Sequence, residues 1–187
     1  MKAMIALAVV VLVSLAAYTA AFAQNSFWVE ERTLLTAEKV TPQLAGTVTH
    51  YFSNKIGASC YFQVGKAYAE AYLGPNFAPR PWIELNASLG LEQADNSFRY
   101  AGSLWLGNKH GYALGIWENG GSDYWYKAVA VAKANKLLAA GGMVQRFAGV
   151  GLRLEVNPVN HVVVWAAPLY EWNSRSMNYL LTLKCNF

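Results

Sequence analysis

The sequence is poor in charge, poor in cysteine and, beyond its first residues, free of long apolar runs. Charged residues make up 14% of the 187 positions, and the formal net charge is only +4. This small basic excess forms no basic stripe, so we expect no nucleic-acid partner. After residue 23, no window holds the roughly 18 consecutive apolar residues that indicate a membrane-spanning helix. The composition therefore excludes a helical membrane protein and argues against a nucleic-acid binder.

Only two cysteines are present, Cys60 and Cys185. Their spacing matches no zinc-binding motif, and we expect neither a metal nor a cofactor. In an oxidising compartment the two thiols could form one disulfide, provided that the strand layout brings them together. The sequence alone leaves that pairing open.

The first 23 residues have the three-part pattern of an export signal. Lys2 precedes an apolar run from Ala3 to Val13, and small residues then lead to the stretch AFA at 21–23. A transmembrane anchor needs about 20 apolar residues, which is more than this run supplies. We therefore expect a signal peptide over residues 1–23, cleaved before Gln24.

Strand-like segments fill most of the remaining chain. Aromatic residues are abundant, with 7 Trp, 11 Tyr and 8 Phe. From residue 44 onward, short runs are divided by turn signals such as GNKHG and ENGGSD, which predicts an all-β protein. We interpret the stretch KANKLLAAGG as a loop. The segments expected to be strands are 44–52, 57–73, 81–93, 97–107, 110–118, 122–134, 143–157, 159–172 and 177–187.

One hairpin shows the alternation most clearly. Between residues 83 and 91, apolar residues alternate with polar or small ones, so one face meets an apolar medium and the other a polar medium. A turn at 94–97 places Leu91 opposite Tyr100 and Glu92 opposite Arg99, which is an opposite-charge pair. The polar faces of this hairpin and of segment 143–157 carry five charged residues: Glu84, Glu92, Arg99, Arg153 and Glu155.

In the segment 159–172, either of two alternate sets of residues could lie on the apolar face. Pairing it with 143–157 puts Trp165 on the apolar face, whereas pairing it with 177–187 selects Ala166. A bulge at Pro168 would reconcile the two registers. The sequence leaves the facing of this segment, and that of 122–134, open.

The segment MNYLLTLKCNF at 177–187 bears on the choice between a soluble and a membrane barrel. Apolar or aromatic residues occupy every second position: Tyr179, Leu181, Leu183, Cys185 and Phe187. This segment resembles the C-terminal signature of Gram-negative outer-membrane β-barrels, although a cysteine is unusual there. The resemblance implies an antiparallel up-and-down barrel in contact with outer-membrane lipid and assembled by the outer-membrane barrel-assembly machinery.

In such a barrel the apolar face meets lipid, and the five charged residues line the lumen as ion pairs. Trp82, Trp125, Trp172 and Tyr179 fall near segment ends, as in the aromatic girdles of membrane barrels. A bacterial single-chain barrel needs an even number of strands, whereas nine segments are seen. We expect eight strands, with 24–43 as a periplasmic lead-in and 44–187 as the barrel. Ten strands follow instead if 27–35 adds one.

No pattern indicates an active site. His50, His110 and His161 lie on or beside three separate segments, with no adjacent carboxylate to orient them. His50 and Ser53 are similar to the His and Ser of outer-membrane lipid A deacylases, but their spacing departs from the H-x-S of that family. Residues three apart in a strand also point to opposite faces. We interpret these residues as strand-end and turn residues.

The patterns favour a small non-enzymatic outer-membrane β-barrel with a structural, envelope-interaction or surface-binding role. A barrel of eight strands is filled by its own side chains, so we expect no general diffusion pore. Two alternatives stay open. One is an enzyme that modifies outer-leaflet lipids, with His50 or His161 as base. The other is a soluble lipocalin-like barrel, periplasmic or secreted, that binds a small apolar ligand.

Overall fold

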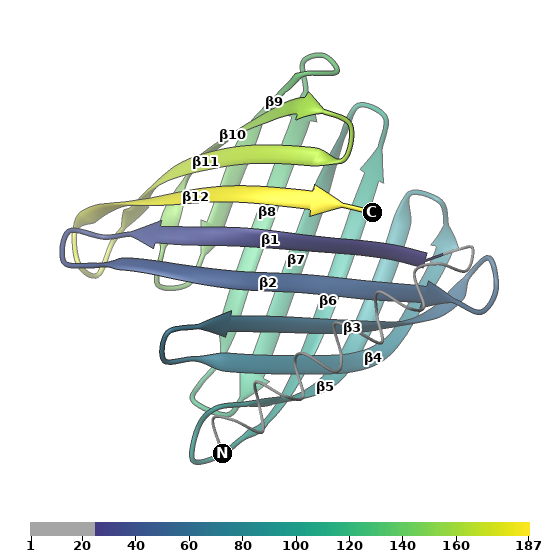
Figure 1. Ribbon diagram of the computed structural model, residues 1–187, viewed down its shortest axis with the longest axis horizontal. Helices are drawn as coiled ribbons and strands as arrows, with labels where there is room; N and C mark the ends of the chain where they lie inside the picture. The colour runs from purple at the N-terminus through teal and green to yellow at the C-terminus, as the bar shows by residue number, and fades with distance from the viewer. Residues whose placement is uncertain (1–24) are drawn as a thin grey trace.

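The computed structural model describes residues 25–187, which form twelve β-strands (Figure 1). The expected signal peptide at 1–23 lies outside the described residues. Within residues 25–187, no helix is available that could cross a membrane. The strands are β1 (Asn25–Leu35), β2 (Val40–Tyr51), β3 (Ile56–Gly65), β4 (Ala69–Arg80), β5 (Ile83–Glu92), β6 (Phe98–Asn108), β7 (Gly111–Gly120), β8 (Trp125–Lys133), β9 (Leu138–Gln145), β10 (Gly149–Val159), β11 (Val162–Glu171) and β12 (Ser176–Asn186).

The strands close into a single antiparallel barrel. Each strand pairs with the next along the chain, and β1 pairs with β12 to complete the ring. The closing seam runs from Trp28, opposite Asn186, to Leu35, and the backbones of Phe27 and Phe187 extend it by two further hydrogen bonds. Closure leaves no strand edge unpaired, which is the condition for a sheet to cross a bilayer.

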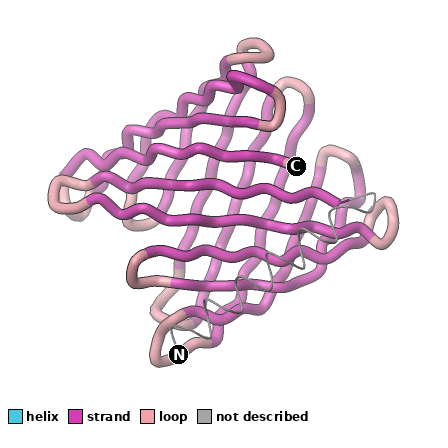
Figure 2. The backbone as a smooth tube through the Cα atoms, viewed as in Figure 1, coloured by secondary structure: helices cyan, strands magenta, loops and turns pink. Residues whose placement is uncertain are grey.

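Short turns join the strands at both ends of the barrel (Figure 2). The turns between consecutive strands contain two to five residues. We call the end at which β1 begins and β12 finishes the seam end, and the opposite end the distal end. Because the turns within residues 25–187 are too short to fold deep into the barrel, strand side chains must fill its interior.

The barrel has twelve strands, so the prediction of eight or ten is wrong. β1 occupies residues that were expected to form a lead-in. β3 and β4 divide the expected strand 57–73, because the chain reverses at 66–68, where Gly65 N–H donates to the Tyr68 carbonyl at 2.7 Å. β9 runs through the stretch expected to be a loop, since its alanines and glycines give the two faces almost no contrast.

The register of the β5–β6 hairpin is shifted by two residues from the predicted one. Leu91 lies opposite Phe98 rather than Tyr100, and the connection spans residues 93–97. Because side chains alternate with a period of two, this shift keeps each of them on its predicted face. Glu92 is therefore not opposite Arg99, yet the Arg99 guanidinium still reaches its carboxylate diagonally across the hairpin.

Strand β11 has the facing that pairing with β12 predicts. Ala166 lies opposite Leu181 on the outer face, and Trp165 is buried in the interior. The irregularity that reconciles β10 with β11 lies between Val156 and Val159, next to their turn, and not at Pro168. This placement leaves the central part of both strands regular.

The outer face of the barrel is apolar. Leu89 and Leu152 are 61% and 65% exposed, and Leu85 and Leu181 also point outward, as the alternation predicts. Glu31 is an exception on this face, where its carboxylate accepts the Thr33 hydroxyl at 2.6 Å. A continuous apolar belt around a closed barrel is typical of contact with lipid rather than with water.

Aromatic side chains lie toward the ends of the strands on the outer face. Trp82, Trp172 and Tyr179 are exposed there, as predicted for interfacial girdles. Trp125 differs, because it lies on the inner face and lines a cavity at the distal end. The segment that resembles the outer-membrane signature forms β12, whose exposed outward residues include Tyr179, Leu181, Leu183 and, just past its end, Phe187.

Side chains from distant strands meet across the interior. In Figure 1, β12, β1 and β2 run across the view in front of β6, β7 and β8, which run steeply behind them. The Tyr112 hydroxyl on β7 donates to Glu155 on β10 at 2.5 Å, and Tyr51 on β2 bonds to Glu84 on β5. Each bond joins two strands that are separated by two others in the barrel wall. The interior is therefore narrow enough for side chains to bridge it.

Candidate functional site in the barrel interior

The inward charges divide between two walls. On β4–β7 there are four carboxylates and one cation, which we call the acidic wall: Glu70, Glu84, Glu92, Glu118 and Arg99. On β1, β8, β10 and β12 there are four cations and two carboxylates, which we call the basic wall: Arg32, Lys127, Arg153, Lys184, Glu30 and Glu155. This separation sets up an electric field across the lumen.

Arg99 is the centre of the acidic wall. Its guanidinium bonds to Glu92 and lies 3.3 Å from Glu118 and 4.0 Å from Glu70. Its Nε donates to the Tyr72 hydroxyl at 2.7 Å, and that hydroxyl lies 3.1 Å from Glu70 and 3.0 Å from Glu118. Because one cation is shared by three carboxylates, this cluster carries an excess of negative charge.

Glu92 connects this cluster to the β7–β8 turn. Its second carboxylate oxygen accepts the backbone N–H of Ser122. Gly121 has a positive φ of 58°, and a Cβ at that position would collide with the Glu92 carboxylate. Glycine therefore permits both the left-handed backbone and the close approach of the turn to the carboxylate.

Small polar side chains line the inner face of β3–β5. The Asn76 amide donates to Ser59 at 2.6 Å and to Glu84 at 3.2 Å. The Asn86 amide donates to the Asn76 side chain at 2.5 Å, and the Ser88 hydroxyl donates to Asn86 at 2.9 Å. Because these side chains are short and polar, this strip presents a hydrophilic surface to the interior.

The basic wall is organised around the Trp165 ring. The Arg153 guanidinium carbon lies 3.8 Å from the ring centroid, and Lys127 Nζ lies 5.6 Å from it. Arg153 Nε donates to Glu155 at 2.6 Å, and Tyr112 donates to the same carboxylate from the facing strand β7. Both cations thus gain a cation–π contact within the barrel.

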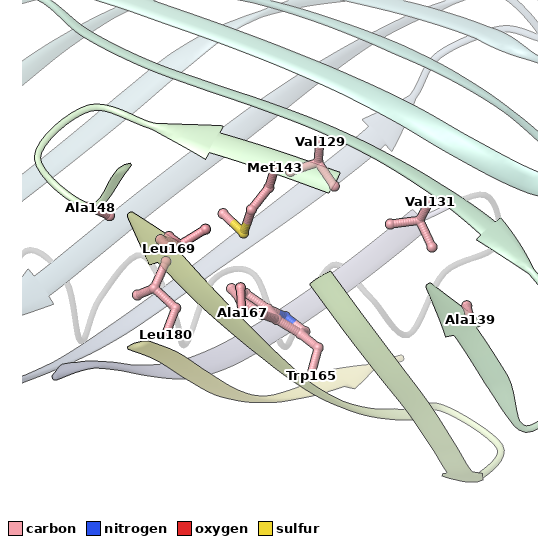
Figure 3. Packing of buried hydrophobic residues seen from close by; sticks show 9 residues of the cluster. All are labelled: Val129, Val131, Ala139, Met143, Ala148, Trp165, Ala167, Leu169 and Leu180. Carbon is pink, nitrogen blue, oxygen red and sulfur yellow. The ribbon is translucent and has the colours of Figure 1, made fainter. Parts of the chain in front are cut away.

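One corner of the interior is closed by apolar packing (Figure 3). These side chains come from β8, β9, the β9–β10 turn, β11 and β12. The cluster consists of Val129, Val131, Ala139, Met143, Ala148, Trp165, Ala167, Leu169 and Leu180. Apolar packing fills this corner up to Trp165, whose ring also contacts Arg153 and Lys127 of the basic wall. The polar strip and the two charged walls therefore border the part of the interior that suits water or solute.

A cavity enters the interior from the distal end. Its volume is about 420 Å³, and its lining combines charged, amide and aromatic side chains, including Arg32, Gln63, Arg99, Trp125 and Phe147. Both charged walls therefore contribute to this cavity.

A second cavity enters from the seam end. Its volume is about 370 Å³, and Tyr51, Glu84 and Trp105 are among its lining residues. The two cavities have no lining residue in common. Between their levels, the ring of Tyr61 lies 6.1 Å from that of Tyr72 and 6.4 Å from that of Trp28. Aromatic side chains, not a loop, therefore separate the cavities along this side.

An ion pair spans the distal rim. Arg146, in the β9–β10 turn, lies 2.6 Å from Asp123, in the β7–β8 turn, and its guanidinium carbon lies 3.6 Å from the Tyr124 ring centroid. The hydrogen bond from Arg146 lowers the pKa of the Asp123 carboxyl below its ordinary value. Asp123 and Tyr124 also line the distal cavity, so this pair fixes part of its mouth.

The structure places the five predicted lumen charges on the inner face but in two groups. Glu84, Glu92 and Arg99 belong to the acidic wall, and Arg153 and Glu155 belong to the basic wall. The remaining inward charges were not among the predicted lumen residues; they are Glu30, Arg32, Glu70, Glu118, Lys127 and Lys184. Glu30 and Arg32 lay in a segment not expected to be a strand, and Glu70 and Lys127 lay in strands whose division or facing was unsettled. Lys184 follows from the predicted alternation of 177–187, although it was not named as a lumen charge. In β1, Glu31 interrupts the alternation between Glu30 and Arg32, so the polarity pattern there is weak.

The cysteines and histidines lie away from these walls. Cys60 and Cys185 are free thiols on β3 and β12, with β1 and β2 between those strands, so no disulfide joins them. His50, His110 and His161 all lie toward the seam end, and the His50 ring packs edge-on against Phe52.

Known structures share the architecture, although sequence comparison finds nothing. No family model and no curated protein matches the chain. The KdgM porin superimposes with a TM-score of 0.58 and 11% identity, over 86% of this chain and 99% of that one. A KdgM porin in complex with disordered oligogalacturonate gives the same values. The NanC porin gives a TM-score of 0.53 and 9% identity, over 85% of this chain and 98% of that one.

Identities this low show the fold alone. The resemblance indicated by the outward residues of β12 is nonetheless confirmed at that level, because the similar structures are outer-membrane porins and the barrel is closed. The chain therefore has the closed β-barrel fold of the small Gram-negative outer-membrane porins.

Proposed function

We propose that this chain is an outer-membrane β-barrel that forms a narrow channel for small polar solutes. The observation that carries the proposal is the polar interior, which a separate cavity enters from each end. The exposed apolar belt supports a place in lipid and argues against the soluble lipocalin-like alternative, whose apolar face would point inward.

The number of strands determines whether a barrel of this kind has a lumen wide enough for solutes to pass. Eight strands enclose a space that side chains fill, whereas 16 to 18 strands leave an aqueous channel. Twelve strands lie between these limits, so the inward side chains decide whether the lumen is open. Aromatic rings and charged groups fill much of it here, and we expect a small conductance. The expectation that the barrel is no diffusion pore rests on eight strands, so with twelve strands it loses that support.

The similar structures favour a channel over a structural role. KdgM and NanC are both porins, and one KdgM structure contains disordered oligogalacturonate. Their fold similarity supports an outer-membrane location. Outer-membrane lipid and the barrel-assembly machinery are the partners that we propose for that location. An export signal at 1–23 is consistent with that route.

A lipid-modifying enzyme fits the geometry less well. In bacterial barrels with an even number of strands, the first strand begins and the last strand finishes on the periplasmic side. The seam end therefore faces the periplasm. His50, His110 and His161 then lie toward the periplasmic side, away from the outer leaflet. The candidate bases of that alternative are therefore on the wrong side of the membrane.

Conductance in planar lipid bilayers tests the proposed function. The wild-type protein should give small, reproducible steps, and Tyr61→Ala should enlarge them because Tyr61 lies between the two cavities. Tyr126→Ala is the matched control, since Tyr126 is exposed on the outer face of β8. Absence of steps from correctly folded wild-type and Tyr61→Ala proteins would contradict a channel.

A further inference from the structure

Five buried side-chain polar atoms have no hydrogen-bond partner among the described residues. Two of them, Gln145 Oε1 and Asn178 Oδ1, are acceptors. The other three, which can donate, are Arg32 Nε, Trp165 Nε1 and Thr182 Oγ1. Each belongs to a side chain that is less than a tenth exposed. Two of the atoms are obligatory donors, and the third, a hydroxyl, can donate. Buried donors without an acceptor are costly, so their grouping calls for an explanation.

These three residues form one row across adjacent strands. Arg32 on β1 lies opposite Thr182 on β12, and Thr182 lies opposite Trp165 on β11. Directly opposed residues have Cβ atoms about 5 Å apart. The unpartnered donors are therefore neighbours on a single patch of the basic wall.

Lys127 adds a positive charge to this patch. It is 6% exposed, and its ammonium lies 5.6 Å from the Trp165 ring centroid. Within residues 25–187, it forms no ion pair with a carboxylate. Arg32, Arg153 and Lys184 place three further positive charges near it, and Glu30 places a negative one. Gln145, whose side-chain oxygen has no partner, lies directly opposite Lys127 on β9.

The carboxylates of the basic wall are already engaged. Glu30 is bonded by Arg32 through Nη2, which leaves Arg32 Nε unpaired. Glu155 accepts from Arg153 and from Tyr112. With four cations and two carboxylates, the wall keeps a formal excess of two positive charges. Buried charge in excess is tolerated when a counter-ion neutralises it.

We infer that this patch is a binding site for a small anion, either the carboxylate of an organic solute or a free inorganic anion. The Lys127 ammonium supplies the charge, and the N–H groups of Arg32 and Trp165 and the hydroxyl of Thr182 supply the donors. The inference rests on the proposed channel, in which such a site would favour the passage of anions over cations.

Iodide quenching of tryptophan fluorescence tests the site. The folded full-length barrel in detergent is titrated with iodide, and the Trp165 contribution is the difference from a Trp165→Phe variant. Lys127→Met should weaken quenching of this contribution about tenfold, the equivalent of one charge-assisted hydrogen bond. Lys133→Met, at the exposed end of the same strand, is the control and should leave quenching unchanged. Quenching by neutral acrylamide should be equal in wild type and Lys127→Met.

Competition distinguishes the two sources of anion. Protection of Trp165 by acetate supports a carboxylate ligand, and protection by inorganic phosphate supports an inorganic one. The inference is overturned if iodide fails to quench Trp165, or if it quenches wild type and Lys127→Met alike. The quenching measurement needs no ion flow, so its result is independent of the conductance test. If quenching depends on Lys127 but no conductance steps are seen, the channel is rejected and the anion site is kept. If conductance steps are seen but quenching does not depend on Lys127, the anion site is rejected and the channel is kept.

Discussion

Arg146 shows how much of the distal rim depends on one side chain. Its guanidinium pairs with Asp123 and lies over the rings of Tyr124 and Phe147, at 3.6 Å and 4.4 Å from their centroids. These contacts join the β7–β8 turn to the β9–β10 turn, which are not consecutive in the chain. The rim is therefore held by charge and stacking as well as by the sheet.

Protonation of Asp123 should weaken this rim. Its pKa is lowered from 3.8 in the folded protein, so the pair stabilises the fold above that value, and the stabilisation disappears as the pH falls through the lower, folded pKa. We expect wild type to be slightly more heat-stable than Asp123→Asn at pH 6, with the difference shrinking as the pH falls below 3.8. Thermal unfolding of both proteins across this range measures it. A difference that does not vary with pH would mean that the carboxylate charge has no such role.

Strand β10 has one face that points toward lipid and one face that points into the barrel interior. Leu152 and Leu154 point outward and are exposed, while Arg153 and Glu155, which alternate with them, are buried in the interior. The period-two pattern places every second residue in lipid and the others in the lumen. The same strand therefore contributes to the apolar belt and to the basic wall.

The depth of a residue on this strand should set the cost of a charge. Leu154 lies near the middle of β10, whereas Val159 is its last residue. Leu154→Arg should lower the free energy of unfolding by about 2–4 kcal/mol and Val159→Arg by about 0–1 kcal/mol, because the penalty peaks at the bilayer midplane. Denaturant titration from lipid vesicles gives both values. Equal losses would show that the two positions do not differ in membrane depth.

Alternation could be predicted from the sequence wherever the two faces differ in polarity. The β5–β6 hairpin, β10 and β12 were found with correct facing for this reason. β9 was missed because alanine and glycine occupy both of its faces. The β3–β4 turn was missed because the chain reverses at Lys66–Tyr68 without proline or a glycine pair to mark it.

The site was less predictable than the fold. Which charges face the lumen follows from the phase of each strand, but which ones meet depends on strands that are distant in the sequence. The grouping of Glu70, Glu92 and Glu118 around Arg99 needs the positions of four strands at once. The row of Arg32, Thr182 and Trp165 depends on the seam between β1 and β12, and β1 was not expected to belong to the barrel.

At the scale of the whole molecule, closure and orientation act together. The seam removes every strand edge, the outer belt is apolar, and the charged groups of opposite walls face one another in the interior. In lipid this arrangement satisfies the backbone, and the ion pairs within each wall compensate part of its buried charge. In water the same barrel would leave its leucines exposed, so the direction of the two faces underlies both proposals above.

Spin labels on neighbouring residues of β5 test that direction. A nitroxide is attached to Leu89→Cys or to Ser88→Cys, each in a protein whose Cys60 and Cys185 are replaced by serine, and the barrel is reconstituted in lipid vesicles. The label at 89 should be relaxed strongly by lipid-soluble oxygen and little by a water-soluble nickel chelate, and the label at 88 should show the lower oxygen accessibility of the two. The reverse order, with position 89 shielded from oxygen and position 88 in lipid, would contradict a barrel whose apolar face meets the membrane.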